Sequence, residues 1–305
     1  SCYYHDSAAC LLKDGKVVAA AQEERFTRKK HDSEFPAKSI DFCLKEAGIC
    51  IQDIQAVGFY DKPLLKFDRL LQTYLATYPH GYRSFMKAIP LWLKKKIWMR
   101  SLIQKELGYD GDIYFGEHHL SHAASAFYAS DYKDAVIVTA DGVGEWATTS
   151  IATGKDLDIE ILKEIHFPHS IGLLYSAFTY FLGFKVNGGE YKVMGLAPYG
   201  KPVFEKFIYD NLIRLHDDGS FDLNMKHFTY PQALTMVGNS FQRLFKIPKR
   251  EAESKLEQVH FDIAASIQKV TEEAMLRLTQ HAYDITHNPR LCLAGCKGIP
   301  TKGPQ

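Results

Sequence analysis

The sequence predicts an α/β fold, and three patterns indicate it. In YYHDSAACLLKDGKVVAAAQEER, two apolar runs flank Asp14-Gly15, which is a strong signal for a β-hairpin. A helical pattern then precedes the strand-like segment IQAVGFY, so helix and strand alternate along the chain. A second hairpin-like unit follows the first: the apolar run AVIVTA, a turn at residues 141–144 and the β-branched run ATTSIAT. This repeated opening predicts two related halves.

The segments between the two hairpins are predicted to be mostly helical. PAKSIDFCLKEAGI spaces Ile40, Cys43 and Ala47 at helical intervals. From about residue 62 to residue 107 the sequence is helical, aromatic and locally basic around Trp92 and Trp98. This insert either faces a membrane or a partner, or is a solvated helical face. DIYFGEHHLSHAASAFYAS then reads as a strand that leads into a helix.

The second half continues with helices and ends on a short strand. IGLLYSAFTYFLGF reads as a buried helix too short to span a bilayer. A glycine-rich turn, VNGGEYKVMGLAPYGKP, separates it from a long helix with an apolar stripe from Val259 to Leu278, and the strand RLCLAG follows. Because such a strand normally continues into more fold, we expect the second half to be cut short. The abrupt opening at Ser1 suggests that upstream residues have also been lost.

Composition narrows the class of protein. The chain has 305 residues, with 37 basic and 36 acidic side chains, and this balance does not favour a nucleic-acid binder. Its six cysteines include no C-x-x-C pair, which indicates a reducing cytoplasm. We find no targeting segment and no membrane span in the sequence.

The clearest candidate site lies in EHHLSHAASAFY. His118 and His122 are four residues apart, so both imidazoles would lie on one helical face and could reach a single ion, whereas His119 points away. The chain has 13 histidines, so chance also supplies this spacing. Asp141, at the end of a buried strand, is either a third ligand or a turn-forming residue.

Two further candidates remain open from the residues alone. His5 interrupts an apolar run of the first hairpin, and it is either a catalytic base or an ordinary hairpin histidine. Around Gly189, the backbone can approach a ligand closely, with Glu190 able to accept from ribose hydroxyls and Lys192 able to meet phosphate. The alternative is a simple loop between helices, since the stretch is neither a Walker loop nor a Rossmann fingerprint.

Several segments, in this order, resemble the NodU/CmcH-type O-carbamoyltransferases. They are YHDSAACLLKDGKVVAAAQEERFTRKKHDSEFP, HHLSHAASAFYAS, ADGVGEWATTSI, GLLYSAFTYFLGF and NGGEYKVMGLAPYGKP. The resemblance implies a Kae1-like, two-lobed fold of the actin/Hsp70/sugar-kinase type. The first lobe would span residues 1–132 with a helical insert at about 62–109, and the second, incomplete lobe residues 133–305. In the family a YrdC-like domain follows, and we expect this chain to lack it.

The resemblance also implies an activity. Family members make carbamoyl-adenylate from carbamoyl phosphate and ATP, and pass the carbamoyl group to a hydroxyl of a sugar, antibiotic or other natural product. His118, His122 and Asp141 match the metal ligands, the metal being typically iron. His5 matches the base that takes the acceptor's proton, while Gly189, Glu190 and Lys192 match the nucleotide region.

We expect the resemblance to end at Gly295, where the family has a second glycine and this chain has Cys296. The chain would then be a fragment that does not make carbamoyl-adenylate by itself and holds metal weakly, if at all. A homodimer is compatible with the sequence. Two alternatives share the fold, namely a Kae1-like threonylcarbamoyl-tRNA modification enzyme and a non-catalytic nucleotide-binding module. The near-neutral charge speaks against the first.

Overall fold

The computed structural model describes residues 1–4, 6–94 and 96–295, which form a mixed α/β protein with four separate sheets. The described chain packs as two compact units. Unit 1 comprises residues 1–67 and 87–116, and unit 2 comprises residues 68–86 together with the chain from Glu117 onward. The sequence-based lobes instead meet at residues 132 and 133. That boundary and the actin-like two-lobed arrangement stay predictions.

Unit 1 begins with the predicted hairpin, which the structure confirms. Strands β1 (Ala8–Lys13) and β2 (Lys16–Gln22) pair antiparallel. Asp14 and Gly15, which connect them, both have positive φ, at 51° and 74°. A two-residue turn of this kind matches the right-handed twist of its strands only when both central residues adopt positive φ, which Asp-Gly does at low cost.

The rest of unit 1 combines helices with a second two-stranded sheet. Helix α2 (Ala37–Ala47) packs on β1 and β2, and strands β3 (Ala56–Phe59) and β4 (Asp112–Phe115) pair parallel. The core contains Phe59, Met99 and Ile113. The insert is helical, as predicted. The short helix after β2 is α1 (Glu24–Thr27). The insert contains α3 (Pro63–Thr77), α4 (Tyr82–Lys94) and α5 (Met99–Leu107). Of these three, only α5 lies wholly in unit 1, because residues 68–86 belong to unit 2.

Unit 2 is built on a four-stranded sheet in the order β10–β5–β6–β7. Its strands are β5 (Asp134–Ala140), β6 (Ala147–Lys155), β7 (Asp158–His166) and β10 (Leu291–Ala294). Strands β5, β6 and β7 are antiparallel neighbours, and β10 runs parallel to β5. The sequence analysis missed β7. This edge strand is only partly buried, so its segment DIEILKEIH is rich in charged residues and lacks a clear apolar run.

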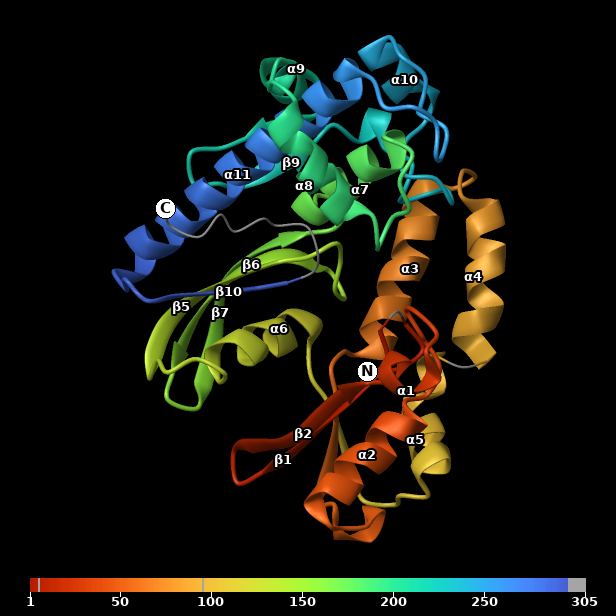
Figure 1. Ribbon diagram of the computed structural model, residues 1–305, viewed down its shortest axis with the longest axis vertical. Coiled ribbons are helices and arrows are strands. Elements are labelled where there is room, and N and C mark those ends of the chain that lie inside the picture. The colour runs from red at the N-terminus through yellow and green to blue at the C-terminus, as the bar shows by residue number, and fades with distance from the viewer. Residues whose placement is uncertain (5, 95, 296–305) are drawn as a thin grey trace. The chain divides into compact units, whose positions relative to one another are not determined.

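Both faces of this sheet are covered by helices, which explains the continuous apolar run of β5. Val136 and Val138 belong to the main core, with α7 (Ile171–Phe181) and α11 (Gln258–Thr286). Ala135 and Ile137, which alternate with them, pack on the other side with Phe127 of α6 (His118–Phe127). Figure 1 shows α6 on one side of the sheet and α7 and α11 on the other.

The remaining elements cover the outer side of α7 and α11. They are α8 (Glu190–Leu196), α9 (Glu205–Asn211), β8 (Ile213–Leu215), β9 (Phe221–Leu223) and α10 (Asn239–Phe245). Helix α8 occupies part of the segment that the sequence analysis treated as a glycine-rich turn. The long helix with its apolar stripe is confirmed as α11. Among the described residues, no helix combines the length and apolar character needed to cross a membrane.

Two glycines near α8 provide a matched test of this packing. A Cβ at Gly200 would lie 2.0 Å from the backbone oxygen of Phe261 in α11, whereas one at exposed Gly195 would meet nothing within 4 Å. We expect Gly200→Ala to lower the free energy of unfolding by about 1–3 kcal/mol, because the helix backbone must move. Gly195→Ala should be neutral or stabilising by up to about 1 kcal/mol, since alanine favours the helix. Urea unfolding of both variants measures this, and equal destabilisation would contradict the packing.

Candidate metal centre

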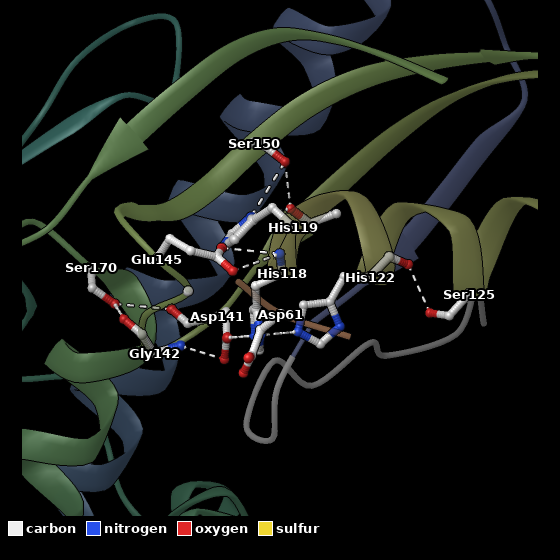
Figure 2. A network of polar contacts seen from close by, with 12 residues as sticks. Asp61, His118, His119, His122, Ser125, Asp141, Gly142, Glu145, Ser150 and Ser170 are labelled. Carbon is white, nitrogen blue, oxygen red and sulfur yellow. Dashed lines mark hydrogen bonds and ion pairs between the residues drawn. The ribbon is translucent and has the colours of Figure 1, made fainter. Parts of the chain in front are cut away.

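Two imidazoles and one carboxylate converge where β5 ends (Figure 2). His118 opens α6, His122 lies one turn later on the same face, and Asp141 directly follows β5. The Nε2 atom of His118 lies 2.6 Å from Oδ2 of Asp141 and 3.1 Å from Nε2 of His122. The Nε2 atom of His122 is 3.6 Å from the same carboxylate oxygen. The structure therefore brings together all three residues for which the sequence suggested metal binding.

The spacing of these three atoms fits a divalent transition-metal ion. Imidazole nitrogen and carboxylate oxygen bind such ions at about 2.0–2.2 Å, so neighbouring ligand atoms lie about 3 Å apart around one ion. The distances of 2.6, 3.1 and 3.6 Å bracket that value. Only the His118–Asp141 pair would have to open slightly. Two histidines and one carboxylate are also a donor set that suits iron(II).

The two oxygens of Asp141 have different roles. Oδ1 accepts a hydrogen bond from the backbone N–H of Gly142 at 2.6 Å, while Oδ2 faces the two histidines. The sequence left two interpretations of Asp141 open, a turn former or a ligand, and the geometry allows both at once. Burial opposes ionisation of this carboxyl, yet hydrogen bonds from His118 and His122 hold its pKa well below the usual range. Asp141 is therefore a carboxylate at neutral pH.

A second buried carboxylate, Glu145, positions the first turn of α6. Its Oε2 and Oε1 atoms accept from the backbone N–H of His118 at 3.0 and 3.3 Å. A negative charge at a helix N-terminus satisfies a backbone donor that lacks an intrahelical partner, and it complements the helix dipole. The sequence analysis missed Glu145. The sequence offered one signal for it: an acidic residue directly after the glycine-containing turn at residues 141–144.

The turn that carries Asp141 and Glu145 is held by residues distant in the sequence. Arg69 of α3 donates to the carbonyl of Gly144 at 2.6 Å. The hydroxyl of Ser170, which also caps α7, donates to the carbonyls of Asp141 and Gly142. A Cβ at Gly144 would lie 3.0–3.1 Å from His119 and His118, so glycine lets the turn pack against α6. Neither Arg69 nor Ser170 stood out in the sequence.

His119 faces the sheet instead of this cluster. Its Nδ1 lies 2.7 Å from the hydroxyl of Thr139, which in turn lies 2.6 Å from the hydroxyl of Ser150 (Figure 2). The side chain is buried, and burial lowers the pKa of His119 to about 4. His119 is therefore a neutral core residue, consistent with its position on the helix.

The predicted nucleotide residues lie at the start of α8. The buried carboxylate of Glu190 accepts from the backbone N–H groups of Asn187 and Gly189 and from the hydroxyl of Ser176. Three of its roughly four acceptor positions are thus used inside the protein. The ammonium of exposed Lys192 lies 5.5 Å from the ring centroid of Phe184. A nucleotide-binding role for Gly189, Glu190 and Lys192 stays a prediction.

The predicted base, His5, lies outside the described residues, so its role also stays a prediction. In the next residue, Asp6, the Oδ1 atom lies 2.9 Å from Nδ1 of His31. The backbone N–H of His31 donates a hydrogen bond to Oε2 of Glu24. These three side chains form a second group of potential metal donors, within unit 1. All three side chains are partly exposed.

Comparisons with known proteins identify relatives of the chain. The family model described as "Carbamoyltransferase N-terminus" matches residues 1–302. An uncharacterised protein of Synechocystis sp., sll1178, is 54% identical and covers 97% of this chain, which spans 49% of that protein. The nodulation protein NolNO of Sinorhizobium fredii is 34% identical over 96% of this chain, which spans 40% of NolNO. The chain thus spans about half the length of these relatives.

Two details of the comparisons bear on the sequence predictions. The family match continues to residue 302, so the expectation that the resemblance ends at Gly295 was wrong. That expectation rested on Cys296, which stands where the family has a second glycine, and the match extends past this single difference. Among solved structures, a Ppx/GppA phosphatase of Aquifex aeolicus matches 94% of this chain and 90% of its own at 12% identity, with a TM-score of 0.23. A score this low carries no argument about the fold.

Removing both imidazoles should abolish metal binding. We expect the chain, dialysed to equilibrium against iron(II) under anaerobic conditions, to contain more iron than the surrounding buffer, and the double variant His118→Ala/His122→Ala to fall to the buffer level. The control, His80→Ala/His166→Ala, removes two exposed histidines outside the cluster and should bind as the wild type. Plasma mass spectrometry gives the metal per chain. Equal iron content in wild type and the His118/His122 variant would contradict the site.

Glu145 should act through the position of His118. We expect Glu145→Gln to lower the free energy of unfolding by about 1 kcal/mol, as for loss of a helix cap, and to weaken metal affinity about tenfold. The exposed Glu160 of β7 provides a control that changes net charge equally, and Glu160→Gln should alter neither quantity measurably. Thermal unfolding and metal titration measure the two effects. A variant with unchanged affinity would show that Glu145 does not support the ligand.

Proposed function

The chain belongs to the carbamoyltransferase family and matches the N-terminal part of its members. From this we propose that it forms the carbamoyl-transfer site of an O-carbamoyltransferase. The observation that carries the proposal is the convergence of His118, His122 and Asp141 in a chain of this family. We further propose that these residues hold a divalent metal ion, and that this ion is iron.

The proposed metal has a non-redox role. When bound, it would supply a Lewis acid that polarises the carbamoyl donor. The protein would hold this ion with the carboxylate of Asp141 and two imidazoles. The low pKa of Asp141, which keeps the carboxyl ionised, supports this role. Glu145 fixes the backbone of His118. His5 would take the proton of the acceptor hydroxyl, so that its oxygen can attack the carbamoyl carbon of carbamoyl-adenylate. The bond from that carbon to the phosphate oxygen would break, and AMP would leave.

The donor of the carbamoyl group is proposed to be carbamoyl-adenylate, made from carbamoyl phosphate and ATP by a YrdC-like part of the whole protein. Adenylate binding would involve the segment around Gly189. Lys192 is the residue there that can meet phosphate, because its ammonium is exposed. Glu190 would mainly order the loop through its hydrogen bonds to Asn187, Gly189 and Ser176, with one acceptor position left for a ribose hydroxyl.

The acceptor is proposed to be a small molecule with a free hydroxyl, such as a sugar or another natural product. The family match supports carbamoyl transfer as the reaction class, and two of the relatives are nodulation proteins, NolNO and NolO. The family match also favours this activity over the tRNA-modifying enzyme and the non-catalytic module that share the predicted fold.

Binding of a stable carbamoyl-adenylate analogue tests this function without knowledge of the acceptor. We expect a sulfamoyl analogue of carbamoyl-adenylate to bind the iron-loaded chain in calorimetry, and to bind at least about tenfold more weakly to His118→Ala/His122→Ala. The double control His80→Ala/His166→Ala should bind it as the wild type does. Absence of binding to the iron-loaded chain, or equal affinity for the variant lacking both imidazoles, would contradict the proposed site.

A further inference from the structure

An ammonium group in unit 1 lies over two aromatic rings. The Nζ atom of Lys96 lies 5.5 Å from the ring centroid of Tyr4 and 5.3 Å from that of Trp92. Both distances are within the range of a cation–π interaction. The ring of Trp92 also contacts that of Phe67, at 5.9 Å between centroids. Lys96 of the insert therefore contacts a ring of the N-terminal segment, Tyr4, and a ring of the insert, Trp92.

Lys96 differs from its neighbour Lys66 in what it pairs with. The ammonium of Lys66 lies 2.5 Å from Oδ2 of Asp61, and both side chains are largely buried. For Lys96, no hydrogen bond or ion pair to an oxygen is found among the described residues, and its side chain is only partly exposed. The charge of Lys96 is thus affected by a second ammonium, that of Lys66, and by one carboxylate, that of Asp61.

The energetics of this arrangement favour an added anion. Removing an ammonium from water is costly unless an opposite charge or hydrogen-bond acceptor replaces the lost solvent. Burial, followed by the nearby charge of Lys66, lowers the pKa of Lys96, and Asp61 only partly offsets this. Cation–π contacts recover about 0.5–2 kcal/mol but satisfy none of the three N–H donors of an ammonium. An oxyanion would satisfy those donors and the excess charge together.

We propose that Lys96, with the ring faces of Tyr4 and Trp92, forms a subsite for an oxyanion, and that this oxyanion is a carboxylate, phosphate or sulfate carried by the hydroxyl acceptor. The assignment to the acceptor rests on the proposed function. Tyr4 directly precedes His5, the predicted base, in the sequence, so a group bound at Tyr4 belongs on the acceptor side of the reaction. The half-exposed ring of Tyr4 also offers flat apolar surface against which a sugar or other ring can pack.

A matched pair of sugars tests the subsite by binding alone. The full chain is labelled with ¹⁵N-tryptophan, and its three indole signals are followed during titration, that of Trp92 being assigned with Trp92→Phe. We expect glucuronate to shift the Trp92 signal saturably, and glucose, which has the same ring without the carboxylate, to leave it unchanged. Lys96→Met should weaken glucuronate binding about tenfold or more, while Lys96→Arg should retain most of it.

The control is Lys94→Met, which removes an exposed ammonium of the same insert and should leave glucuronate affinity unchanged. Equal binding of glucose and glucuronate, an unchanged affinity in Lys96→Met, or an equal loss in Lys94→Met would overturn the proposal. If Lys96→Met does not fold, Lys96→Gln takes its place. Carbamoyl phosphate and AMP form a further arm. If they shift the Trp92 signal at lower concentrations than glucuronate does, and Lys96→Met abolishes that shift, the assignment of the oxyanion to the acceptor is overturned.

The same titration separates this inference from the proposed function. It needs neither metal nor catalytic turnover, so glucuronate binding through Lys96 would support the oxyanion subsite even if the carbamoyl-adenylate analogue fails to bind. Conversely, the outcome in which the analogue binds while Lys96→Met leaves glucuronate affinity unchanged has the opposite meaning. That result would support the transfer site and overturn the oxyanion subsite.

Discussion

The charge of Asp141 is the constraint on which the architecture of unit 2 depends. A carboxylate that is largely removed from water must be compensated, and the surrounding elements supply that compensation. Helix α6 brings two imidazoles to Oδ2, and the turn after β5 brings the N–H of Gly142 to Oδ1. Ser170 holds the turn to the start of α7. The same turn carries a second buried acid, Glu145, which accepts from the backbone N–H of His118 at the start of α6.

Much of this centre could be predicted because its signals are local. The spacing of His118 and His122 gives a shared helical face, and Asp141 ends an apolar strand that must be buried. That the two segments meet could not be read from spacing. It depends on α6 packing across β5 through Phe127 and Ile137, a contact between elements that no periodicity encodes. The supporting residues Glu145, Arg69 and Ser170 were missed for the same reason, since each acts on backbone groups of another segment.

The elements themselves divide in a similar way. The hairpin at Asp14-Gly15, the buried run of β5 and the stripe of α11 have strong patterns and were predicted correctly. Strand β7 was missed because a partly exposed edge strand can carry charged residues and needs no continuous apolar run. The start of α8 was taken for a turn because its glycines dominate the composition. There the structure shows the buried carboxylate of Glu190 binding the backbone of the preceding loop, which suits a helix start.

The fixed role of Oδ1 in Asp141 has a consequence for how the residue can coordinate. Because Oδ1 accepts from the N–H of Gly142 and Oδ2 faces both histidines, Oδ2 is the oxygen placed to be a ligand, and monodentate binding through it would leave the hydrogen bond of Oδ1 undisturbed. Together with two imidazoles, it would fill three positions of an ion that commonly accepts six. The coordination sphere would then retain exchangeable positions, as expected of a centre that handles a passing substrate and not of one that only braces the fold.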